Sequence, residues 1–495
     1  MLTRSATAIL ALATLALAAR LVFQPDPRDG LRQADALFTA GRYHDALAAY
    51  RRVASNAPGD ATARLRLGMV LVIRGEGPAA SRELGRALGL GIDPAEAALA
   101  RLYQGRMAAD MGYGDEAVRA WAQIPPSSPL YGPRLALEAE ERLRAGDYAT
   151  AEARYRAALA AGLPESWRAA AHLRLAALRA SSDSVGALAE LRAASAPPRG
   201  VQPVELPLIA PLIPPARPDA GQLAAALAAD EATRPQILGQ LYLHAGLLPL
   251  AEVQFVAAQA LGDVAHRAGT YAAYTRWISG DPEGSAAQLR TLAAAAPGDP
   301  RPRAMLALIY LAARDAPAAL AEIQAAQGIA PRDPEALLAL GRWHAAQRDY
   351  TAAAAAYDEA RRAASPAERG RYALEQARYH LEVAIEVCDA GLPAAVTAAT
   401  LLPEDAGAWS ALSRAQLACG DAARARQAAE RALTLAPASP EAFYHLGRAL
   451  GALGERRAAQ QALVRAADLA PASVWRVRAE AQMAALGLAI TANTP

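Results

Sequence analysis

Lysine is absent from this sequence, and all 51 cationic side chains are arginine. The absence excludes enzymes that need a lysine amine, among them P-loop nucleotide hydrolases, protein kinases, Schiff-base enzymes and Ser-x-x-Lys acyl transferases. The seven histidines are scattered, with no His-Glu-x-x-His motif, and no Gly-x-Ser-x-Gly elbow or glycine-rich phosphate loop occurs. We therefore expect no catalytic residue, no metal site and no cofactor, and we expect that the chain is not an enzyme.

Cysteine is scarce, since only Cys388 and Cys419 occur, and their spacing rules out a Cys-x-x-Cys metal or redox site. We expect each to be a small core residue, with a disulfide between neighbouring repeats as the alternative. The net charge is +2, and acids and bases are interspersed without a basic block. Nucleic acid is therefore not an expected partner.

Aromatic residues make up only 5% of the chain, whereas alanine is abundant and runs of β-branched residues are nearly absent. This composition favours an all-α protein. The 495 residues also exceed what one compact core holds, which points to several domains or to an array that grows by repetition.

A period of 34 residues favours the array. Pro297 and Pro331 are 34 positions apart, and so are Pro403, Pro437 and Pro471. Units starting at 300, 334, 406 and 440 all carry leucine at their seventh place and small residues at their eighth, twentieth and twenty-seventh, and apolar residues also stand at the fourth place in three of them and at the eleventh in two. This pattern predicts two helices that pack face to face, with a turn near the fifteenth place, where glycine is common, and a proline after the second helix.

The pattern resembles the tetratricopeptide repeat (TPR) family, and the resemblance covers most of the chain after residue 27. Further units begin near 27, 61, 98, 132, 232 and 266. We predict an α-solenoid of tandem helix-turn-helix repeats in two arrays. Two irregularities are expected: an extended first helix in the long unit 368–405, and a capping helix between 474 and 488 that carries Val477, Ala481 and Leu486.

The predicted organisation has five parts. Residues 1–25 form a signal peptide or an N-terminal membrane anchor, 26–195 the first array, 196–218 a proline-rich linker, 219–488 the second array with its cap, and 489–495 a disordered tail. The N-terminal segment joins one cation, Arg4, to an apolar stretch from Ala6 to Ala19. Whether it is cleaved or spans the membrane, the bulk of the chain is expected outside the cytoplasm.

The linker 196–218 carries eight prolines and cannot be helical throughout. It also contains aliphatic residues such as Leu206, Ile209 and Leu212, which make it too apolar for a free tether. Two alternatives stay open: it lies along a groove of the protein's own superhelix, or it docks on another protein.

The TPR resemblance implies a concave groove lined by the second, fifth, ninth and twelfth places of the first helices. Arginine recurs at the ninth place, and the candidate groove residues are Arg342, His380, Arg414, Tyr444 and Arg448. Such a cationic stripe suits carboxylates of a partner peptide. The alternative is that Arg342 and Arg448 form ordinary solvated ion pairs with Glu335 and Glu441.

The resemblance implies a protein-interaction scaffold or adaptor, membrane-anchored or exported, that binds partner peptides or helices in its groove. A regulatory or assembly subunit of an enzyme complex, in which another chain is catalytic, is the alternative function.

Overall fold

Alanine-rich segments of 8 to 17 residues form the helices of this protein. The structure, a computed structural model, describes residues 27–196, 206–214, 218–262 and 267–488 of the 495-residue chain. Within these ranges the chain is helical throughout, without a strand, and successive helices pack as antiparallel pairs. The predicted all-α solenoid of tandem helix-turn-helix repeats is therefore confirmed.

Five helix pairs precede the proline-rich segment. They are α2 (Pro27–Thr39) with α3 (Tyr43–Asn56), α4 (Ala61–Ile73) with α5 (Gly77–Leu90), α6 (Pro94–Asp110) with α7 (Gly114–Ala122), α8 (Tyr131–Arg144) with α9 (Tyr148–Ala161), and α10 (Glu165–Arg179) with α11 (Ser184–Ser195). A 3₁₀ helix, η1 (Pro207–Leu212), and the short α12 (Ala220–Leu227) follow.

Seven more pairs and a last helix complete the described chain. They are α13 (Arg234–Ala245) with α14 (Leu248–Ala260), α15 (Arg267–Ile278) with α16 (Pro282–Ala295), α17 (Arg301–Ala312) with α18 (Ala316–Ile329), α19 (Pro334–Ala346) with α20 (Tyr350–Ala363), α21 (Arg369–Val383) with α22 (Leu392–Leu401), α23 (Ala406–Ala418) with α24 (Ala422–Leu435), α25 (Pro440–Ala452) with α26 (Arg456–Leu469), and then α27 (Val474–Ala485). Whether the pairs before and after the linker form two separate arrays stays a prediction.

The turn inside most pairs contains a residue in the left-handed region, as the fifteenth-place glycines suggested. Gly420 and Gly454 have φ values of 85° and 79°. Two repeats place arginine there instead, and Arg314 and Arg348 adopt φ values of 61° and 62°. The left-handed backbone conformation costs a residue with a side chain about 1 kcal/mol, so the packing of these helix pairs must stabilise the turn.

Small residues at the eighth place let the two helices of a pair approach closely. A Cβ added to Gly341 would lie 2.9 Å from the Tyr357 ring, and one added to Gly447 would lie 2.6 Å from Leu463. Tyr357 and Leu463 stand at the twenty-fourth place of their repeats. The predicted contact between these places therefore holds each pair together.

The irregular unit 368–405 differs in part from its prediction. Its first helix, α21, has 15 residues, two more than α19 or α23, and it ends where Ala384 and Glu386 adopt left-handed conformations with φ values of 55° and 50°. The additional residues form a π-helical turn, η2 (Val387–Gly391), before Pro393 begins α22. The expectation of an extended first helix is therefore confirmed in part, because the other additional residues lie in η2.

The cysteines are paired, which corrects the expectation that each is a small core residue. Cys388 lies in η2, and its sulfur is bonded to that of Cys419, at the C-terminal end of α23. The Cα atoms are 5.5 Å apart. The additional turn therefore links one repeat covalently to the next.

The capping helix α27 is present, and Leu486 at its C-terminal end packs on the preceding repeat as predicted, but the helix itself packs through a different face from the predicted one. Ala479 and Met483 are buried against α25 and α26, whereas Val477 and Ala481 are exposed. A shift of two residues turns the contact face by about 200° on a helix with 3.6 residues per turn.

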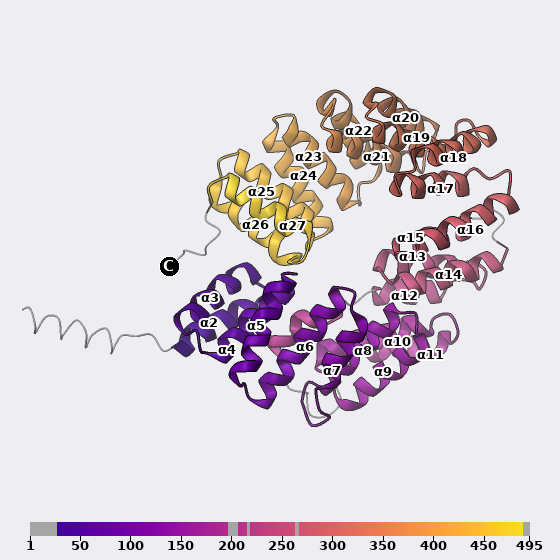
Figure 1. The fold of residues 1–495 in the computed structure, drawn as a ribbon. Coiled ribbons are helices and arrows are strands. Elements are labelled where there is room, and N and C mark those ends of the chain that lie inside the picture. Colours follow the sequence, from indigo (N-terminus) through magenta and orange to yellow (C-terminus); the bar gives the residue numbers. More distant parts are fainter. Residues whose placement is uncertain (1–26, 197–205, 215–217, 263–266, 489–495) are drawn as a thin grey trace, which may run out of the picture.

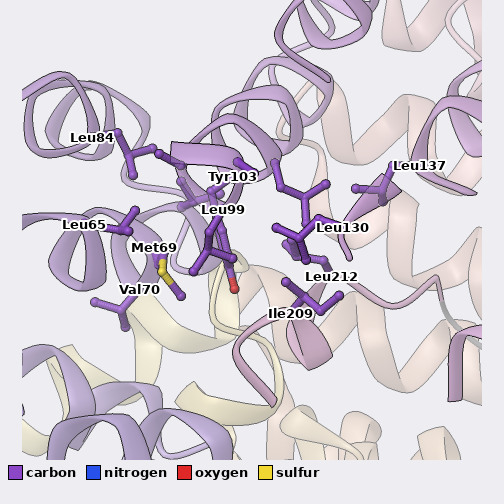
Figure 2. Packing of buried hydrophobic residues seen from close by; sticks show 14 of the residues in the cluster. Leu65, Met69, Val70, Leu84, Leu99, Tyr103, Leu130, Leu137, Ile209 and Leu212 are labelled. Carbon is purple, nitrogen blue, oxygen red and sulfur yellow. The ribbon is translucent and has the colours of Figure 1, made fainter. Parts of the chain in front are cut away.

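Part of the proline-rich segment packs on the protein itself. Ile209 and Leu212 of η1 are 1% and 0% exposed and belong to the large core cluster of the first five pairs (Figure 2). The Tyr103 hydroxyl, on α6, donates a hydrogen bond of 2.5 Å to the Leu208 carbonyl oxygen. Residues 206–214 thus dock internally, which is the first of the two alternatives; residues 197–205 and 215–217 lie outside the described ranges.

The solenoid curves until its first and last repeats meet (Figure 1). The backbone N–H of His44, on α3, donates to a carboxylate oxygen of Asp468, on α26, at 2.8 Å. The Arg74 guanidinium donates to the Glu480 carboxylate, on α27, at 2.7 Å, and Arg74 is only 5% exposed. We call these four residues the clasp.

No helix among the described residues is long and apolar enough to cross a membrane. The predicted signal peptide or anchor, residues 1–25, and the predicted tail, residues 489–495, lie outside the described ranges.

Candidate partner-binding surfaces

A cleft of about 1120 Å³ is hollowed into the face formed by four successive first helices, α15, α17, α19 and α21. Its apolar lining includes Tyr271, Tyr274, Trp277, Met305, Leu308, Leu338 and Tyr372. Its charged lining includes Arg267, Asp299, Arg301, Asp333, Glu335, Arg342, Glu368, Arg371 and Glu375.

The cleft follows the groove places predicted from the repeat. Arg301, Ala304 and Leu308 are the second, fifth and ninth residues of the unit from 300, and all three line it. In the unit from 334 the same places hold Glu335, Leu338 and Arg342, which also line it. Arg342 therefore faces a real cleft.

Aromatic and aliphatic side chains give the cleft its apolar character. Tyr274 and Trp277 contact each other edge to face, with ring centroids 6.0 Å apart. They stand at the ninth and twelfth places of the unit from 266. Met305 and Leu338 come from the next two first helices. Such a lining can desolvate apolar side chains of a bound segment.

The charged groups of the cleft pair with one another. The Arg342 guanidinium donates to the Glu375 carboxylate at 3.1 Å, and Arg371 likewise binds Glu335. Both ion pairs join α19 to α21. Arg342 is thus an ion-pair residue, as the alternative reading held, but its partner is Glu375 rather than Glu335. The cleft is a surface of mixed charge and not part of a cationic stripe.

One half-buried carboxylate at the cleft, that of Asp333, has a defined structural role. Asp333 caps α19 by accepting the backbone N–H of Ala336 at 2.9 Å. Burial raises the pKa of Asp333 above its usual value, against the opposing effect of this hydrogen bond. The side chain fixes the start of α19 and therefore the position of Leu338 and Arg342.

The other predicted arginines lie further along the same series of first helices. Arg448 lies 5.8 Å from the centroid of the Tyr444 ring, and Arg478 lies 5.0 Å from that of Trp475. Tyr444 and Trp475 are 5.7 Å apart. The Arg414 guanidinium donates to the Leu381 carbonyl oxygen. We call Arg414, Tyr444, Arg448, Trp475 and Arg478 the arginine cluster.

Electrostatics indicate that the cluster is a cationic surface. Burial and then the charges of Arg448 and Arg478 lower the pKa of Arg414, although Glu382 and Glu441 oppose them. Among the described residues, no carboxylate lies within ion-pair distance of Arg448 or Arg478. An anionic group of a partner could therefore bind here without displacing an internal ion pair.

Glu441 is directed toward a histidine rather than toward Arg448. Its carboxylate lies 3.8 Å from Nε2 of the buried His445. Burial lowers the pKa of His445, and Glu441 only partly opposes this effect. The predicted Glu441–Arg448 ion pair is absent among the described residues, so Glu441 does not occupy the Arg448 guanidinium.

His380 lies away from these surfaces. It is 1% exposed, and its Nδ1 is 2.9 Å from the Ile385 carbonyl oxygen. The groove register of this unit begins near 367, so its second, fifth and ninth places are Glu368, Arg371 and Glu375, all in the cleft. The structure does not bring His380 together with Arg342.

Sequence reasoning missed several residues that share the groove places. Tyr274 and Leu308 were passed over because recurrence of arginine was the criterion. Trp475 and Arg478 were passed over because the last helix was treated only as a cap. Reading the second, fifth, ninth and twelfth places of every first helix would have found all four.

Metal binding has no support within the described residues, where no group of three or more His, Cys, Asp or Glu side chains could hold an ion.

Comparison with known proteins finds repeat models in separate parts of the chain. One tetratricopeptide repeat model matches residues 31–95, 272–334 and 304–368, and a second matches residues 440–473. These stretches together cover less than half of the chain. No curated protein matches the sequence significantly.

Three solved structures illustrate the likeness. Yeast Tom70 is 13% identical with a TM-score of 0.41, covering 93% of this chain and 95% of its own. PilF of Pseudomonas aeruginosa is 17% identical with a TM-score of 0.36, covering 44% and 98%. YrrB, described as a TPR protein with an unusual peptide-binding site, is 19% identical with a TM-score of 0.31, covering 39% and 97%.

At these identities and TM-scores, none of the three informs the shape or the function of this chain. The sequence matches identify tetratricopeptide repeats in the stretches named above, and the repeated helix pairs of the described residues agree with such repeats.

Proposed function

We propose that this chain is a non-catalytic scaffold that binds segments of partner proteins along the face of its first helices. The observation that carries the proposal is the cleft on α15, α17, α19 and α21. Its volume of about 1120 Å³ is enough for several side chains of an extended segment or for one face of a helix.

The lining of the cleft favours a partner segment with apolar anchors. Tyr274 and Trp277 are rigid, amphipathic side chains of the kind that dominate binding energy at interfaces. The ion pairs Arg342–Glu375 and Arg371–Glu335 form a polar rim that can exchange hydrogen bonds with a peptide backbone. The partner's apolar side chains would supply affinity, and the rim would supply orientation.

The arginine cluster favours an acidic stretch in the same partner or in a second one. Guanidinium groups bind carboxylates bidentately, and Arg448 and Arg478 lack internal carboxylate partners among the described residues. Tyr444 and Trp475 beside them offer apolar contact to the stems of acidic side chains. This part of the proposal retains Arg414, Tyr444 and Arg448 from the sequence-based site.

We also propose that the scaffold works outside the cytoplasm, membrane-anchored or exported. The disulfide Cys388–Cys419 supports this location, because structural disulfides persist mainly in oxidising compartments and both cysteines of the chain are used in it. The apolar N-terminal segment that precedes Pro25 supports it independently.

The test is site-specific photo-crosslinking in the cells that produce the protein. A photo-reactive residue replaces Met305, inside the cleft, and in a matched variant it replaces the exposed Val253, on α14 outside the cleft. We expect a discrete crosslinked partner from position 305 and none from position 253. The same products from both positions, or none from 305, would contradict binding in the cleft.

The acidic-partner component has its own test. Arg448→Gln with Arg478→Gln is compared with Arg424→Gln, where the arginine side chain is 74% exposed and lies on α24. We expect the first variant to bind the captured partner more weakly and with less dependence on salt than the control. Unchanged salt dependence would remove the arginine cluster from the proposal and leave the cleft standing.

A further inference from the structure

The first-helix face of the N-terminal repeats differs in chemistry from that of the C-terminal repeats. Leu65 and Met69 occupy the fifth and ninth places of the unit from 61, and Leu99 the second place of the unit from 98. All three are buried, whereas the places equivalent to Met69 and Leu99 hold the charged Arg342 on α19 and Glu368 beside α21, both at an open cleft; only the place of Leu65 is apolar there as well, with Leu338. Something therefore covers the N-terminal face.

The cover is the chain's own segment 206–214. It packs on α2 through η1, and Ile209 and Leu212 join the same buried cluster as Leu65, Met69 and Leu99 (Figure 2). The two aliphatic residues are three positions apart, so on a 3₁₀ helix they project from the same side. The remaining aliphatic residues, Leu206, Leu208 and Ile213, pack at the edge of the cluster.

The contact has the features of a peptide in a binding site. Prolines at 207, 211 and 214 restrict the backbone, so that little conformational freedom is lost when the segment is seated. Among the described residues, the side-chain hydrogen bond at this contact runs from Tyr103 to the backbone carbonyl of Leu208, an acceptor that any sequence could supply. Specificity therefore comes from the two aliphatic side chains.

The segment lies between α11 and α12 in the chain, about 10 residues from the end of α11. Its tether keeps it at a high effective concentration near the face, so an external ligand must compete with it.

We propose that the face of α2, α4 and α6 is a second binding site, which residues 206–214 occupy as an internal competitor. Its ligand is a partner segment that presents two aliphatic side chains three residues apart in a proline-flanked 3₁₀ or extended backbone. The site is separate from the cleft, so the failure of one proposal leaves the other standing.

The test uses the full chain and a fluorescent peptide with the sequence of residues 206–214, Leu-Pro-Leu-Ile-Ala-Pro-Leu-Ile-Pro. In the variant Ile209→Asp with Leu212→Asp, the internal segment carries two charges that the buried face cannot accommodate. We expect saturable binding of the peptide to this variant by fluorescence polarisation, and at least tenfold weaker binding to the wild type. A peptide with aspartate at the same two positions is the control ligand.

A second variant protects the test against loss of the fold. Ile209→Ala with Leu212→Ala weakens the internal segment without burying charge, and circular dichroism reports whether the helices persist. Adding Tyr103→Phe to either variant should weaken peptide binding several-fold, because the hydrogen bond to the Leu208 carbonyl is lost. Helical variants that bind neither peptide, or bind both equally, would overturn the proposal. A wild-type dimer formed by exchange of this segment, without peptide binding to the variants, would overturn it in favour of a second copy as the ligand.

Discussion

Replacement of one glycine tests how the helix pairs pack. A Cβ added to Gly105, on α6, would lie 2.1 Å from Nε1 of Trp121, on α7, and 2.5 Å from two other ring atoms. Ordinary contacts begin at 3.4 Å, so the ring or the helix must move by about 1.3 Å. Trp121 is buried and its indole N–H donates to the Leu102 carbonyl oxygen at 3.0 Å, which leaves it little freedom.

The free energy follows from three effects. Overpacking a filled core costs about 1–3 kcal/mol. Weakening the indole hydrogen bond adds about 1 kcal/mol, while the better helix propensity of alanine returns about 1 kcal/mol. We therefore expect Gly105→Ala to destabilise the α6–α7 pair by about 1–3 kcal/mol. The matched control is Gly85→Ala, on α5, where a Cβ meets nothing within 4 Å and the pair should gain about 0.5–1 kcal/mol.

Native-state hydrogen exchange measured on peptides from α4 to α7 resolves the two effects locally, which a global unfolding curve of a repeat protein does not. Faster exchange in α6 and α7 for Gly105→Ala, with slower exchange in α5 for Gly85→Ala, is the expected result. Equal or slower exchange for Gly105→Ala would refute the reasoning that this glycine is required by the close approach of the tryptophan.

Two further predictions concern contacts between distant repeats. Burial raises the pKa of Asp468 from 3.8 to about 6. The closed clasp therefore binds a proton on Asp468 more tightly than an open form would. The free energy of closure should become more favourable by about 1.4 kcal/mol per pH unit as the pH falls from 6 to 4. Burial also acts to raise the pKa of Glu480, but hydrogen bonds from His44 and Arg74 hold it at about 2, so closure should weaken again below pH 4. Distances between spin labels on α3 and α27 measure both pH effects, and Asp468→Asn should abolish the strengthening between pH 6 and pH 4. A clasp that opens steadily as the pH falls from 7 would contradict the role given to Asp468. Cys388→Ser with Cys419→Ser should destabilise the joined repeats by about 2–4 kcal/mol, measured as a lower denaturant midpoint of unfolding. Wild-type protein in reductant should show the same lower midpoint, and reductant should not change the midpoint of the double variant.

The sequence predicted those parts of the fold that depend on local pattern. Prolines 34 positions apart and glycines near the fifteenth place identified the helix pairs, because a helix end and a left-handed turn are properties of a few adjacent residues. The face of α27 was misassigned because a last helix has only one neighbouring repeat, so Val477 and Ala479 were equally plausible core residues from the sequence alone.

Long-range contacts could not be predicted in the same way. His44 and Asp468 meet across 424 positions, and this contact depends on a small rotation at every intervening repeat. The disulfide was only an alternative because the π-helical turn that positions Cys388 arises from left-handed residues at Ala384 and Glu386, neither of which is a residue type that favours that conformation.

The candidate site was predicted in position more successfully than in composition. Arg342, whose unit keeps the 34-residue period, lines the cleft from the ninth place, and Leu338 lines it from the fifth. The same reasoning misplaced His380, because the unit around it departs from the period and its register had to be assumed. Charge pairing such as that of Arg342 with Glu375 depends on side chains from two repeats, so the sequence of one repeat could not reveal it.

The most direct measurement of the central claim is the affinity of the partner segment, once crosslinking has identified it, for three forms of the full chain. Tyr274→Ala removes an aromatic side chain from the cleft, and Tyr113→Ala removes an equally large, 53% exposed one elsewhere. The account predicts at least tenfold weaker binding, about 1.4 kcal/mol, for Tyr274→Ala and wild-type affinity for Tyr113→Ala by isothermal titration calorimetry. Wild-type affinity for both variants, or equal losses, would contradict binding in the cleft.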